Sequence, residues 1–110
     1  MARNLVALTI AVGATASTVA QGSGQTLCGL YIPAALTGTT LTFNAYGAGG
    51  QFGNLITDGS GNAVTKTVKS ATDQYIDLSQ DLIAAGIDGI QVISGTTQAT
   101  NPANLTAVFR

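Results

Sequence analysis

The chain lacks most of the side chains that carry enzymatic and metal chemistry. It contains no His, no Glu and no Trp, and its one cysteine is Cys28. Without His and with one Cys, a transition-metal site is close to excluded, and we expect neither a bound metal nor a cofactor. A cysteine nucleophile would also lack its usual His partner. We therefore interpret Cys28, which lies in an apolar run, as a small hydrophobic residue.

Charge is also scarce, at 8% of 110 residues, whereas an average soluble domain is roughly a quarter charged. The basic side chains, Arg3, Lys66, Lys69 and Arg110, are scattered, and nucleic-acid binding needs them clustered, so we expect no nucleic-acid partner. No run of about 20 apolar residues is present, so we expect no membrane span. A surface so poor in ions can pack against other protein without burying unpaired charge. We expect the few ions at turns and rims, away from such contacts.

What is present is an alternation of apolar and polar residues with a period of two, which is typical of β-strands. The length fits one domain, residues 1–110. The pattern predicts about eight strands and one short helical turn near 79–86. With turn residues between the strands, it indicates an all-β, antiparallel β-sandwich that is jelly-roll-like. The predicted strands are 3–12, 26–32, 40–46, 52–57, 63–69, 74–78, 87–94 and 105–109, with a further short strand possible at 18–20.

The N-terminal segment 1–25 begins with an apolar run, Leu5–Val12, that superficially resembles a secretory signal. Thr9 interrupts this run, and its alternation fits a strand better. We expect the segment to act as a strand or arm that makes subunit contacts, by pairing with the sheet edge of a neighbour.

The strongest turn signal is Asp58–Asn62, with the sequence Asp-Gly-Ser-Gly-Asn. Its oxygen-bearing residues alternate as in a Ca²⁺-binding loop, but no further acidic residue lies nearby to complete a site. We therefore predict a hairpin turn there, because Gly and Asn readily adopt positive φ.

Two sets of side chains are candidates for chemistry. Asp77 and Asp81 could pair as general acid and base, with Asp73 and Asp88 close in sequence. Asp81 also suits the first turn of a helix, and we favour such structural roles and expect no enzymatic activity. Tyr46 and Phe52 flank a glycine-rich loop and are candidate carbohydrate contacts, although Phe52 could equally anchor the loop in the core.

Several passages in residues 26–110 resemble small proteins encoded among the structural genes of tailed bacteriophages. They are Gly29–Ala35, Leu41–Phe43, Asp58–Gly59, Tyr75–Ser79, Leu82–Gly86, Ile90–Gly95 and the final Asn104–Arg110. The resemblance implies a capsid decoration, or cement, protein. Such a protein binds the outer surface of the virion capsid, often as a homotrimer, and stabilises contacts between major capsid protein subunits.

This chain is poorer in charged and aromatic residues than many such relatives, which leaves its contact surface undefined. The Tyr75–Gly95 passage also resembles discoidin-like sugar-binding sandwiches. The alternative function is therefore a carbohydrate-binding module on the virion, used for host attachment.

Overall fold

The computed structural model describes residues 4–22, 25–46, 53–78 and 89–110 of the chain. These residues form nine β-strands and no helix. The strands are β1 (Asn4–Ile10), β2 (Ala16–Gln21), β3 (Leu27–Ile32), β4 (Thr40–Tyr46), β5 (Asn54–Leu55), β6 (Lys66–Thr67), β7 (Gln74–Asp77), β8 (Gly89–Ser94) and β9 (Ala103–Phe109).

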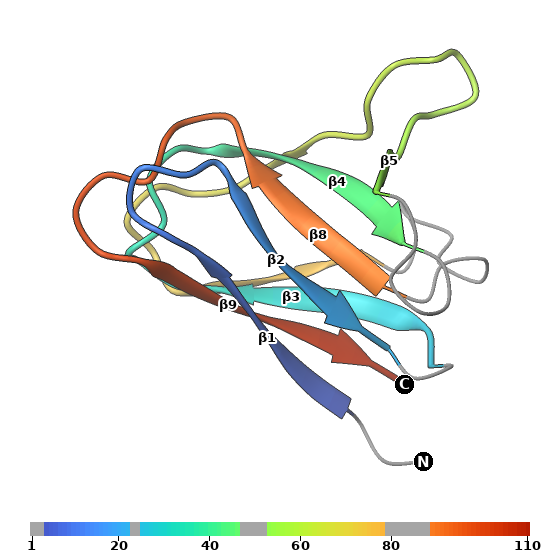
Figure 1. The fold of residues 1–110 in the computed structure, drawn as a ribbon, viewed down its shortest axis with the longest axis horizontal. Helices are drawn as coiled ribbons and strands as arrows, with labels where there is room; N and C mark the ends of the chain where they lie inside the picture. The colour runs from blue at the N-terminus through green and yellow to red at the C-terminus, as the bar shows by residue number, and fades with distance from the viewer. Residues whose placement is uncertain (1–3, 23–24, 47–52, 79–88) are drawn as a thin grey trace.

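The strands form two antiparallel sheets that face each other as a sandwich (Figure 1). The four-stranded sheet has the order β1-β9-β3-β7, and the five-stranded sheet the order β2-β8-β4-β5, with β6 also paired to β4. The first four strands pair with later strands in reverse order, as in one long hairpin that is folded over. The pairs are β1 with β9, β2 with β8, β3 with β7, and β4 with β5 and β6. Successive pairs fall in alternate sheets, which is the jelly-roll arrangement.

The core lies between the sheets and follows from the two-residue period of each strand. On β1, Leu8 and Ile10 are fully buried, while Leu5 and Ala7 point outward and are exposed. The same alternation buries Leu41 and Phe43 on β4 and, on β9, every second residue from Ala103 to Phe109. The two large aromatic side chains of the core therefore come from opposite sheets.

The prediction of an all-β antiparallel sandwich is confirmed. About eight strands were expected and nine are present, because the further short strand considered possible at 18–20 is present as β2, while β5 and β6 lie within the expected strands 52–57 and 63–69. The predicted strand 40–46 has the bounds of β4. The helical turn expected near 79–86 lies outside the described residues.

The hairpin turn at 58–62 is confirmed, and Asp58 organises it. The backbone N–H of Asp58 donates to the carbonyl of Asn62 over 2.7 Å. The Asp58 carboxylate accepts the N–H groups of Ser60 and Asn62 at 2.8 and 3.1 Å, as in an Asx turn. Gly61 has a φ of 85°, which explains the glycine there. The carboxylate is thus used to hold the turn.

One buried polar side chain, Gln98, joins three loops at one end of the sandwich. It is 1% exposed. Its Nε2 donates to the carbonyls of Ala35 and Asn101 at 2.6 and 2.7 Å, and its Oε1 accepts the N–H of Thr37 at 2.9 Å. Its backbone also bonds to the β1–β2 turn at residues 13–14. The amide is fully satisfied, so its burial fixes these loops relative to one another.

The N-terminal segment is built into the sandwich. β1 pairs with β9 along its whole length, from Asn4 with Phe109 to Ile10 with Ala103. β2 pairs with β8, and its Ala20 is fully buried. The segment is therefore part of the fold, and its role in subunit contacts stays a prediction.

Candidate contact surfaces

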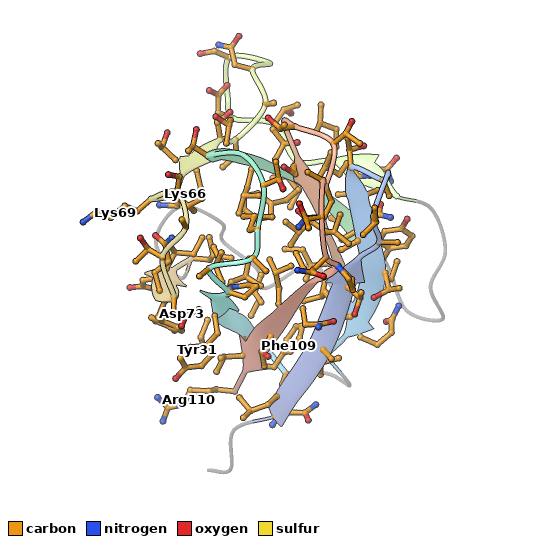
Figure 2. The ribbon with its side chains drawn as sticks, turned by 90° about the vertical axis from the view of Figure 1, so that its left-hand side faces the viewer. Tyr31, Lys66, Lys69, Asp73, Phe109 and Arg110 are labelled. Carbon is orange, nitrogen blue, oxygen red and sulfur yellow. The ribbon has the colours of Figure 1, made fainter. Side chains whose placement is uncertain are left out.

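The described charged residues all lie at turns, at strand ends or at the C-terminus. They are Asp58, Lys66, Lys69, Asp73, Asp77 and Arg110. Strands β1, β2, β3, β4, β8 and β9 contain no charged residue. In Figure 2 the labelled ions lie on one side, that of the chain between β6 and β7, while β1 and β2 lie on the other. Among the described residues, the side formed by β1 and β2 therefore carries no charge, and we call it the uncharged side.

Both strands of this uncharged side are sheet edges. β1 ends the four-stranded sheet and β2 ends the five-stranded sheet, and the two pack beside each other. The N–H of Thr9 donates to Thr18 Oγ1 over 3.0 Å, which directs it away from β9. Since antiparallel pairs alternate, the N–H and C=O groups of Leu5 and Ala7 also point away from β9. In the described residues these groups have no partner strand.

The two edges differ in how they resist further pairing. β2 has an irregular register between Ala16 and Val19, where Ser17 Oγ accepts the N–H of Val92 over 2.9 Å. Bulges of this kind are a common protection of sheet edges. β1 is regular, uncharged and free of proline, and its Leu5 side chain is 56% exposed. Of these two edges, the N-terminal half of β1 is thus the better suited to pair with another strand.

A second surface lies on the outer face of the four-stranded sheet, where Tyr31 of β3 and Tyr75 of β7 stand directly opposite each other. Their ring centroids are 4.9 Å apart, with the planes tilted by 53°. The two side chains are 45% and 47% exposed. Next to them is an open depression of about 450 Å³, which Pro33, Asp73 and Asn104 also line.

Neighbouring groups fix the walls of this depression. Asp73 Oδ1 accepts the N–H of Ala34 over 2.7 Å, which orients the carboxylate. The Asn104 Oδ1 accepts the hydroxyl of Thr9 over 3.0 Å. Gln74 bonds to both backbone groups of Lys69, at 3.1 Å to the N–H and 2.7 Å to the carbonyl. The aromatic pair is therefore bordered by polar groups that are already positioned.

The predicted carbohydrate contact Tyr46 lies on the outer face of the other sheet. Its hydroxyl lies 3.3 Å from Gln91 Oε1, which also accepts the Asn44 amide at 3.0 Å, and Gln91 Nε2 donates to the Ser17 carbonyl at 2.8 Å. The end of the Tyr46 ring packs against Gly53. Tyr46 thus belongs to a half-buried network across three strands. Phe52 lies outside the described residues.

Two of the four acidic candidates, Asp73 and Asp77, lie in the described part of the chain. Asp77 is the last residue of β7 and is exposed, Asp73 is exposed in the preceding loop, and Asp81 and Asp88 lie outside the described residues. Among the described residues, no group of three His, Cys, Asp or Glu is placed to hold a metal ion. Cys28 is half-buried, with its Sγ 3.5 Å from the Thr26 carbonyl.

The tyrosine pair was missed at the sequence level. Neither Tyr31 nor Tyr75 was assigned a role from the sequence. The usable signal was that both occupy outward positions of their strands. Recognising the pair also required the β3–β7 register, which places Tyr31 opposite Tyr75.

Comparisons with known proteins do not assign the chain to a family. No protein-family model matches the chain, and no curated protein matches it. One solved structure that aligns with it comes from work described as "Bacillus endospore appendages form a novel family of disulfide-linked pili". The alignment covers 98% of this chain and 86% of that one, at 15% identity and a TM-score of 0.45. At these values it supports no assignment. The described part of the chain holds no helix long and apolar enough to cross a membrane.

Proposed function

We propose that the chain is a non-enzymatic structural protein of a bacteriophage virion. It binds the outer surface of the capsid, associates with itself as a homotrimer, and stabilises contacts between subunits of the major capsid protein. The proposal rests on the sequence resemblance and on one structural observation, the uncharged side with the open β1 edge.

The physical argument starts from that edge. A regular, uncharged edge strand is a liability in a free monomer, because it can pair with any exposed strand. Pairing with a neighbouring protein would satisfy the outward backbone groups of Leu5 and Ala7 and cover the Leu5 side chain. No charge on β1 or β2 would have to be buried in this contact.

Repetition supplies the strength of such a contact. A protein bound at many equivalent positions, and in contact with itself, gains from multivalency even where each contact is modest. Jelly rolls occur in viral capsid proteins and in lectins, but a shared fold is an analogy and does not establish function.

The test is the copy number of the chain in purified particles of the encoding phage, measured by quantitative mass spectrometry. We expect many copies per capsid, and we expect particles that lack the chain to release DNA at a lower temperature or after a milder osmotic shock. Absence of the chain from particles would overturn the proposal.

A further inference from the structure

The Tyr31–Tyr75 depression lies mainly over β3 and β7 and is not needed by the proposed function. We propose that it binds the neutral sugar units of a polysaccharide. Its volume of about 450 Å³ falls within the ~300–1,000 Å³ typical of small-molecule sites. The inference is independent of the proposed function, because sugar binding can be measured on the isolated chain.

The aromatic part of the site suits the apolar faces of sugar rings. Tyr31 and Tyr75 keep about half of their surfaces exposed although they contact each other. Gly29 helps to set their position, because the Tyr75 ring passes over it and a Cβ there would collide with the ring and with the Ile76 carbonyl. The sheet therefore backs the Tyr75 ring, with the Tyr31 ring beside it, and ring faces of this kind pack on C–H groups.

The polar part of the site suits sugar hydroxyls. Asp73 uses one carboxylate oxygen on the Ala34 N–H, which leaves acceptor capacity on the other. Asn104 accepts from Thr9 through its Oδ1, so its NH₂ group remains available as a donor. The Tyr31 hydroxyl makes no hydrogen bond within the described residues. Donors and acceptors thus border the rings, as a ligand rich in hydroxyl groups requires.

Charge narrows the class of sugar. Asp73 is the one ionised side chain among the residues that line the depression. An acidic sugar would bring its carboxylate close to that of Asp73, and none of the lining residues is a cation that could offset the repulsion. The site therefore favours neutral sugars over uronic or sialic acids.

The experiment is affinity electrophoresis of the purified chain in gels that contain dextran, mannan, galactan or, as the acidic comparison, alginate. We expect retardation in at least one neutral gel and none in alginate. Tyr31→Ala and Tyr75→Ala should each weaken that retardation at least about tenfold, as expected for loss of one aromatic anchor. Circular dichroism melts check that these variants remain folded.

Conservative variants keep the test informative even if an alanine variant unfolds. Tyr31→Phe keeps the ring and should retain most of the binding, while Asp73→Asn keeps an acceptor for Ala34 and should weaken it. Tyr46→Phe, on the other sheet, is the control and should change nothing.

Three results would overturn the proposal. The first is that no neutral polysaccharide retards the chain. This result would also overturn the proposal if a proline-rich peptide were found to bind the depression instead. The second is retardation that Tyr46→Ala abolishes and the Tyr31 and Tyr75 variants do not. The third is retardation of the parent chain in alginate as strong as in the neutral gels, since that would remove the preference for neutral sugars.

Discussion

The two sides of this sandwich differ in what they expose. The β1–β2 side has no described charge and presents backbone groups and an exposed leucine at a regular edge. The β3–β7 side carries an aromatic pair bordered by Asp73 and lies near the lysines at 66 and 69 (Figure 2). The first side suits extended contact with protein, and the second suits a small polar ligand. The two sides of one small domain therefore offer different kinds of contact.

The largest effect is expected within β1 itself, between its inward and outward side chains. Leu8→Ala should destabilise the fold by about 3 kcal/mol, because Leu8 is fully buried and its loss leaves a cavity. Leu5→Ala should cost less than about 0.5 kcal/mol, since Leu5 is exposed. Urea unfolding followed by circular dichroism measures both. An unchanged free energy of unfolding in Leu8→Ala would mean that β1 is an arm that can detach from the sandwich.

Gln98→Ala should be the next most damaging change, at about 2–3 kcal/mol, since it leaves the Thr37 N–H and two loop carbonyls without their partner. The backbone bonds of residue 98 to the β1–β2 turn remain in this variant, so the effect measures the side-chain bonds alone. Gln21→Ala is the control, because Gln21 is exposed. Equal unfolding midpoints for the two variants would show that the Gln98 bonds do not stabilise the fold.

Gly29→Ala should cost about 1–2 kcal/mol, because the added methyl group has to displace the Tyr75 ring and meets the Ile76 carbonyl. The same change should reduce polysaccharide retardation by moving the ring. Gly59→Ala, where nothing lies within 4 Å of the added Cβ, is the matched control. Thermal melts and affinity gels of both variants test this, and full retention of binding in Gly29→Ala would contradict the assigned role of the ring.

A smaller effect on stability than that of Gly29→Ala is expected from the tyrosine pair. Tyr31→Ala and Tyr75→Ala should each cost about 0.5–1 kcal/mol, the usual range for a cross-strand aromatic contact. Their effect on sugar binding should be much larger than their effect on folding. A loss of several kcal/mol in urea unfolding would instead assign the pair a structural role.

The strands could be predicted where the alternation is strong and the side chains are large. β4 is the clearest case, since Leu41 and Phe43 alternate with polar residues and the turn signals flank them closely. β2 was harder, because small residues such as Ala16 and Ser17 contrast little in hydropathy. The expected strand 18–20 lies within β2 but is shorter, since pairing with β8 extends it.

The surfaces depended on information that the sequence does not carry locally. The Tyr31–Tyr75 pair arises from the register of two strands that are distant in the chain. Gln98 lies in a connection expected only to be polar, and its burial depends on loops that fold over it from elsewhere. The scarcity of charged residues is plain from the sequence. That the described charged residues lie away from β1 and β2 could be recognised only from the order of the strands in the sheets.

The most direct test of the account places one charge on the β1 edge and, in a second variant, one charge on the β5 edge. Leu5 on β1 and Leu55 on β5 are exposed to similar extents, 56% and 50%, and both lie on edge strands. Binding of Leu5→Lys and Leu55→Lys to capsids that lack the chain is measured as copies bound per particle. The account predicts that Leu5→Lys lowers the affinity at least about tenfold, or ~1.4 kcal/mol, while Leu55→Lys binds like the parent. Equal binding by both variants, with both folded, would contradict it.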